Sequence, residues 1–119
     1  MVPQTASAMQ KERRKHARYS IENAVVISPD GIYQVIDISE GGFRFKCNPL
    51  TAVPETWVSD ILNSVIPLDE LLTKKIWISV NENFNVPSLM FVGAKFNDLK
   101  EEQKLKLTKL LQSISAEQM

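Results

Sequence analysis

The chain has 119 residues, of which 44% are hydrophobic and 24% charged, and its formal net charge is zero. This length suits one domain with a modest core, and the balanced charge provides no global field to attract nucleic acid or an acidic membrane. A single cysteine, Cys47, excludes an internal disulfide framework and favours a reducing compartment. Without a membrane-length apolar run or a signal-peptide hydrophobic region, we expect a soluble, cytoplasmic protein that does not insert into a membrane.

Residues 1–10 have no periodicity and are mostly small or polar, which predicts a flexible tail. The arm that follows, residues 11–18, contains five basic residues and one acidic residue, so it has a charge of +4 and leaves −4 for the rest of the chain. An isolated charge run of this kind is usually a solvated linker. The basic residues of the arm are Lys11, Arg13, Arg14, Lys15 and Arg18.

A β-hairpin is predicted next. The stretches Tyr19 to Ser28 and Ile32 to Ile38 are rich in β-branched and aromatic residues, and Pro29-Asp30-Gly31 between them has turn chemistry. If two antiparallel strands pair about this turn, the numbers of paired residues sum to about 59. Arg18 is then expected across from Gly41, so the basic arm would lie beside the end of the second strand.

In that second strand, the period of two puts Asp37 and Ser39 on one face and Ile36 and Ile38 on the other. The two isoleucines are expected to enter a core, and the two polar residues are expected to face outward.

Gly41 and Gly42 follow without side chains, which allows a sharp turn or the close approach of a flat ligand. A purine suits such a place. Guanine offers its N1–H and N2–H groups to a carboxylate such as Asp37, and its O6 and N7 accept hydrogen bonds from an arginine fork. Arg14 and Arg18 could supply such forks or clamp phosphates.

The pattern Arg14-x-x-x-Arg18 followed by Asp37-x-Ser39-x-x-Gly42 resembles the two-part signature of PilZ domains, bacterial receptors for the second messenger cyclic di-GMP. Two later segments strengthen the resemblance. GFRFKC, residues 42–47, is similar to a strand of the family, and VGAKFNDL, residues 92–99, is similar to its last barrel strand and the exit into a helix. The resemblance covers residues 11–111, and it is weakest over residues 49–75.

The resemblance implies that the two motif arginines bind phosphate and guanine, and that the Asp-x-Ser-x-x-Gly residues surround a guanine. Arg13, just ahead of the motif, could reach a second nucleotide, because some family members bind an intercalated pair. The residues expected to bind the ligand are Arg13, Arg14, Arg18, Asp37, Ser39, Gly41 and Gly42.

Residues 42–47 alternate cleanly and predict a third strand, with Phe43, Phe45 and Cys47 on the core side. Arg44 falls on the polar face, where a solubilising role is favoured over an extension of the anion site. Cys47 is most simply a small core residue.

Between residues 55 and 66, apolar residues fall at helical spacing and predict a short amphipathic helix whose Trp57 face covers one end of the barrel. A strand confined to Ser64 to Leu68 is the alternative. Lys75 to Asn81 then predicts a strand that turns Trp77 to the side opposite its aliphatic residues, packed under a helix rather than stacked on a base.

Ser88 to Phe96 predicts a last strand with Met90, Val92, Ala94 and Phe96 inward and close packing at Gly93. A helix should begin at Asp98, whose spacing to Glu101 resembles a capping box, and run to about Ser113. Its buried face would hold Leu99, Leu107, Leu110, Leu111 and Ile114. Leu105 lies nearly opposite, exposed or used in self-association.

Together these features predict a mainly β protein: a small six-stranded antiparallel β-barrel of PilZ type with a C-terminal α-helix. Residues 11–116 would form one PilZ-like domain, with the barrel at about 18–97 and the helix at about 98–114. We expect the arginine arm to order on cyclic di-GMP and to signal to an unidentified effector protein.

Catalysis is not expected. The chain has one histidine, one cysteine, no cluster of metal ligands and no phosphate-cradling glycine motif, so we expect no cofactor and no metal. Two alternatives stay open: a nucleotide-independent protein adaptor, for example in pilus or flagellar machinery, and a small nucleic-acid binder. The protein is expected to be a monomer or a weak homodimer.

Overall fold

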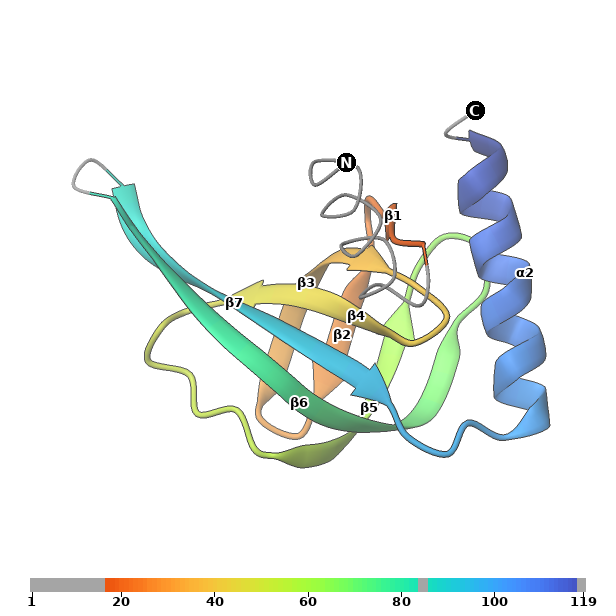
Figure 1. Cartoon of the computed structure of the whole chain (residues 1–119), viewed down its shortest axis with the longest axis horizontal. Coiled ribbons are helices and arrows are strands. Elements are labelled where there is room, and N and C mark those ends of the chain that lie inside the picture. The colour runs from red at the N-terminus through yellow and green to blue at the C-terminus, as the bar shows by residue number, and fades with distance from the viewer. Residues whose placement is uncertain (1–16, 84–85, 118–119) are drawn as a thin grey trace, which may run out of the picture.

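The computed structural model describes residues 17–83 and 86–117. Within this part of the chain, seven strands form one antiparallel sheet and a single helix follows them (Figure 1). The tail and residues 11–16 lie outside the described residues, so the expectations for them stay predictions. The elements are β1 (Tyr19–Ser20), β2 (Val25–Ser28), β3 (Gly31–Ile38), β4 (Gly42–Cys47), β5 (Thr56–Leu62), β6 (Leu68–Asn83), β7 (Val86–Phe96) and α2 (Glu101–Glu117).

The sheet closes on itself. Its hydrogen-bonded order is β1-β3-β2-β5-β6-β7-β4, and β4 also pairs with β3, which closes a barrel of six strands and leaves β1 as an additional strand on β3. Closure removes the exposed edges along most of the sheet and encloses the core. The predicted six-stranded antiparallel barrel with a C-terminal helix is therefore confirmed. Its most deeply buried large side chains are Phe45, Ile38, Ile61, Leu68, Leu71 and Leu110.

The β2–β3 hairpin has the predicted register, with Ser28 paired to Gly31 and Val25 to Gln34. The strand before the turn is not continuous, however, because the chain breaks between β1 and β2 and Asn23 adopts a left-handed φ of 57°. As a result β1 pairs two residues out of step with the hairpin, Tyr19 with Ile38. The expected pairing of Arg18 with Gly41 was therefore wrong, since this register places Arg18 beside Ser39.

A β-bulge in β3 changes which side chains enter the core. Val35 pairs with Phe45 and Asp37 pairs with Arg44, so Ile36 is an extra residue on β3. Val35 and Ile38 are fully buried, whereas Ile36 is only half-buried. The prediction that Ile36 and Ile38 share the core face was wrong for Ile36, because the bulge interrupts the strict alternation of the strand.

The predicted helix over residues 55–66 was also wrong, as was the alternative strand at residues 64–68: the segment is strand β5, Thr56–Leu62. Trp57, Ser59 and Ile61 are buried at a period of two, while Val58 lies outside with 47% of its surface exposed. Ser59 can occupy a core position because its hydroxyl forms a hydrogen bond of 2.7 Å with Thr73 Oγ1. The alternation expected of a strand is not visible in the sequence, because Ser59 is buried while the aliphatic residues Val58 and Leu62 are exposed.

Strand β6 begins at Leu68 rather than at Lys75, so the region that the sequence left unassigned belongs to the barrel wall. From Thr73 onward β6 pairs with β7. Figure 1 shows the ends of these two strands extending together away from the rest of the barrel. Strand β7 follows the prediction, with Met90, Val92 and Ala94 buried and Phe96 half-buried.

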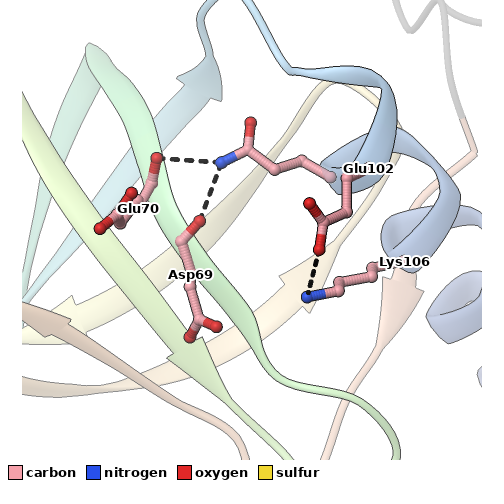
Figure 2. Close-up of polar contacts among 5 residues, drawn as sticks. Asp69, Glu70, Glu102 and Lys106 are labelled. Carbon is pink, nitrogen blue, oxygen red and sulfur yellow. Dashed lines mark hydrogen bonds and ion pairs between the residues drawn. The ribbon is translucent and has the colours of Figure 1, made fainter.

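Helix α2 begins later than predicted, at Glu101. Asp98 has a φ of 48° and does not cap the helix; instead, the Gln103 side chain accepts a hydrogen bond from Lys100 N at 2.8 Å. Gln103 also donates hydrogen bonds to Asp69 O at 2.8 Å and to Glu70 O at 3.0 Å, which join the helix to β6. Figure 2 shows these bonds beside the Glu102–Lys106 ion pair.

The predicted apolar face of α2 is buried against β1 and β6, with Leu99 half-buried just before the helix. Leu105 on the opposite side is 71% exposed, as its position in the helical period predicted. Among residues 17–83 and 86–117, no helix is both long and apolar enough to cross a membrane.

Candidate functional site

Four strands contribute one residue each to a row on the outer face of the barrel. Asp37 of β3 pairs with Arg44 of β4, Arg44 pairs with Gly93 of β7, and Gly93 pairs with Trp77 of β6. Directly paired residues in antiparallel strands share a face and have their Cβ atoms within about 5 Å. The row therefore places a carboxylate, a guanidinium group and an indole ring side by side.

Two bulges create this alignment. Ile36 is the extra residue that sets Asp37 opposite Arg44, and Ile76 is the extra residue that sets Trp77 opposite Gly93. A bulge shifts the pairing by one residue and re-aims the side chains that follow it. Strict alternation from Val35 and Lys75, without the bulges, would instead put Asp37 and Trp77 on the core side of their strands.

Arg44 and Asp37 form an ion pair, with Arg44 Nη2 donating to Asp37 Oδ2 at 2.6 Å. The Asp37 side chain is 10% exposed and the Arg44 side chain 36% exposed, so the carboxylate is deeper than the guanidinium group. Arg44 Nε is buried and has no hydrogen-bond partner among the described residues. The favoured solubilising role for Arg44 was therefore wrong, because this side chain is committed to Asp37.

Ser39 organises the turn between β3 and β4. Its Oγ accepts hydrogen bonds from Gly41 N at 3.2 Å and Gly42 N at 3.3 Å, and its backbone N donates to Gly42 O at 2.8 Å. A serine that satisfies backbone groups within its own turn fixes the shape of that turn. The Ser39-x-x-Gly42 part of the motif thus has a local structural role, whatever the cleft binds.

Gly42 is needed for close packing of β4 on β7. A Cβ atom at Gly42 would lie 2.8 Å from Lys95 Cα and closer still to Ala94 O, so no other residue fits without moving one strand. Gly93 is constrained in the same way by the Trp77 ring, whose Cζ2 would lie 2.8 Å from an added Cβ. The backbone O of Gly41 accepts a hydrogen bond from Phe96 N at 2.9 Å.

A cleft of about 440 Å³ opens over this row, within the range of small-molecule sites. Of the residues predicted to bind ligand, the structure brings Arg18, Asp37, Ser39, Gly41 and Gly42 to its walls. Arg13 and Arg14 lie outside the described residues. Among the described residues, the charged side chains that line the cleft are three cations and one carboxylate, an excess of +2: Arg18, Arg44 and Lys95 against Asp37.

Sequence reasoning missed several walls of the cleft. Trp77 was expected to pack under a helix, but it is half-buried beside the cleft and lies over Gly93. Lys95 was not considered. The signal that could have identified both is the glycine at residue 93, because a glycine within a strand marks a place where a ring or a backbone comes close.

Other reactive side chains lie away from the cleft. Cys47 is buried, as expected for a core residue; burial raises the pKa of its thiol, and a hydrogen bond with Thr51 offsets part of that rise. Within the described part of the chain, no three His, Cys, Asp or Glu side chains are grouped as metal ligands. The cleft is thus the place where polar, charged and aromatic groups converge.

A closed six-stranded antiparallel barrel with one additional strand and a C-terminal helix is a PilZ-like fold. The structure is similar to a solved PilZ domain, that of YcgR from Escherichia coli with cyclic di-GMP, with a TM-score of 0.71 and 14% sequence identity. The similarity covers 88% of this chain and 93% of the other. No protein-family model matches the sequence, and no curated protein matches it.

Proposed function

We propose that the cleft binds cyclic di-GMP and that the protein is a receptor for this second messenger. The observation that carries the proposal is the convergence of Arg18, Asp37, Arg44 and Trp77 on one cleft, whose described lining residues have a net charge of +2. Cyclic di-GMP has two phosphate charges to neutralise and flat guanine bases to stack. The similarity to a PilZ domain determined with cyclic di-GMP supports the same choice of ligand.

Guanine recognition falls to Asp37. A carboxylate can accept about four hydrogen bonds, so Asp37 can keep its 2.6 Å bond to Arg44 and still receive the N1–H and N2–H groups of a guanine. Arg44 acts as a positioning residue that fixes the carboxylate and balances its charge. The base would then lie flat along the row, with its face toward the indole of Trp77.

Phosphate binding falls to the arm. Arg18 lines the cleft beside Ser39, at the point where the arm joins β1. Arg14 lies four residues before Arg18 in the sequence, and Arg13 is next to Arg14. The arm can therefore bring further guanidinium groups to the same ligand. Charge-assisted hydrogen bonds from such groups to phosphate are short and roughly twice as strong as neutral ones.

Binding then orders the arm. Fixing each backbone residue costs about 1–2 kcal/mol, so several arginine–phosphate bonds are needed to offset the ordering of residues 11–18. The ordered arm would present a new surface beside the cleft, and we propose that an effector protein recognises it. A non-enzymatic role and a cytoplasmic location stay predictions of this proposal.

The test is a calorimetric titration of the full chain with cyclic di-GMP. Arg14→Ala, Arg18→Ala and Asp37→Asn should each weaken binding at least tenfold, because each removes a charged partner of the ligand. Lys46→Ala is the matched control, since Lys46 lies on β4 one outward position beyond Arg44 and does not line the cleft. Absence of binding by the wild-type protein at millimolar cyclic di-GMP would exclude the proposal.

An NMR titration locates the site independently. Cyclic di-GMP should shift the amide resonances of Arg18 and of residues 37–42, and it should leave those of the buried face of α2 unchanged. Cyclic di-AMP, which has the same two phosphates without the N2–H donor of guanine, should bind much more weakly because Asp37 loses its partners. Equal binding of the two nucleotides would argue against the role of Asp37.

A further inference from the structure

Strand β6 leaves one edge of the barrel open. Its pairing with β5 ends at Lys74, and the last backbone bond on that side is Lys75 N to Glu55 O at 2.8 Å. From Ile76 onward, β7 is the strand that pairs with β6 in the described part of the chain. Alternate N–H and C=O groups of Ile76–Val80 therefore point away from the sheet without a strand to receive them.

The composition of this edge is unusual for an exposed strand. The sequence Ile-Trp-Ile-Ser-Val, residues 76–80, contains no charged residue and no proline, the residues that commonly protect an edge strand from pairing. Ile76, Ile78 and Val80 are 51%, 43% and 48% exposed. Open backbone groups combined with exposed β-branched side chains form a template for one more β-strand.

We infer that this edge, residues 76–80 of β6, pairs antiparallel with the same edge of a second copy of the chain. Such a pairing has two-fold symmetry and closes at the dimer. Centred on Ile78, it sets Ile78 opposite Ile78 and Ile76 of one copy opposite Val80 of the other, so apolar side chains meet apolar side chains. Residues 76–80 contain no charged side chain, so the pairing brings no like charges together. The net charge of the whole chain is zero, which imposes no overall repulsion between two copies.

The interface is small, since it adds a single short strand to each sheet. Dimers of this size are weak and concentration-dependent. We therefore expect the monomer at low concentration and a growing fraction of dimer as concentration rises into the millimolar range. This inference does not depend on the proposed ligand, and its test uses the protein without nucleotide.

Sedimentation velocity over a concentration series tests the inference with two matched variants. Ile78→Lys places a charge in the centre of the pairing and should weaken dimerisation at least tenfold. Leu105→Lys makes the same change at the 71% exposed leucine on α2 and should leave dimerisation unchanged. Circular dichroism melting establishes that both variants are folded.

A mixed sample of isotope-labelled and unlabelled protein gives the direct readout. Nuclear Overhauser effects between copies should join backbone atoms of residues 76–80 to the same stretch of the partner. A protein that stays monomeric at millimolar concentration overturns the inference. So does a dimer that survives Ile78→Lys, or one that Leu105→Lys abolishes, because the interface would then lie elsewhere, for example on the helix.

Discussion

Arg44 lies directly across the β3–β4 pair from Asp37, and its Nη2 is 2.6 Å from Asp37 Oδ2. The carboxylate proposed to recognise guanine is therefore held in place by a neighbouring strand of the protein itself. Preorganisation of this kind lowers the cost of binding, because the acceptor need not be fixed when the ligand arrives.

Arg44→Met should weaken cyclic di-GMP binding about tenfold and lower the free energy of unfolding by about 1–2 kcal/mol, since a largely buried carboxylate loses its charged donor. Calorimetry and urea denaturation measure the two effects. Lys46→Met is the control on the same strand, and it should change neither quantity appreciably. Tighter binding by Arg44→Met would mean that Arg44 competes with the guanine for Asp37 instead of positioning it.

Trp77→Ala should reduce the affinity for cyclic di-GMP about tenfold, because stacking of a base on an aromatic side chain contributes about 1–3 kcal/mol. The chain has two tryptophans, and Trp57 is buried in the core with 8% exposure. In Trp57→Phe, the fluorescence of Trp77 should still change on addition of ligand. In Trp77→Phe that change should be lost, and a persistent signal from Trp57 would place the base elsewhere.

Gly42→Ala should destabilise the protein by about 1–3 kcal/mol or more, as overpacking between two paired strands does. The added methyl group would overlap Ala94 O, so β4 and β7 would have to separate. Thermal melting measures the effect. The backbone of Gly41 does not have a positive φ, so Gly41→Ala should melt close to the wild type.

Ser59 and Thr73 share a hydrogen bond of 2.7 Å inside the barrel, and both are 1% exposed. Thr73→Val alone should cost about 1–2 kcal/mol, because the buried Ser59 hydroxyl loses its partner. Ser59→Ala alone should cost less, since the Thr73 hydroxyl still donates to Leu71 O at 3.0 Å. The double variant should cost clearly less than the sum of the two, since no hydroxyl is then left unpaired. Strict additivity in urea denaturation would show that the two hydroxyl groups do not interact.

Gln103→Ala should lower the free energy of unfolding by about 1–2 kcal/mol, because this side chain both caps α2 and donates to two carbonyl groups of β6. Glu102→Ala is the adjacent control. It removes only the exposed ion pair with Lys106, which contributes about 0–1 kcal/mol. Equal losses from the two variants would show that Gln103 has no special role in docking the helix.

The local periodicity of the sequence predicted those elements whose apolar residues follow a simple rule. Strand β4 alternates Phe43, Phe45 and Cys47 inward, and the buried face of α2 repeats at helical spacing, so both were predicted correctly. Strand β5 was missed because Ser59 occupies a core position while Val58 and Leu62 lie outside. A serine becomes a core residue only when a partner such as Thr73 is present, and no pattern within residues 56–62 contains that information.

Local sequence determined the register of the β2–β3 hairpin and the strands β4 and β7, because turn chemistry and strand alternation act over short distances along the chain. The six-stranded barrel was predicted with the help of the resemblance to PilZ domains, since strand alternation alone missed β5. Tertiary structure alone decided that Asp37, Arg44, Gly93 and Trp77 form one row. That row depends on two bulges and on pairings between strands up to about fifty residues apart, and a bulge is fixed by the strand it faces rather than by its own sequence.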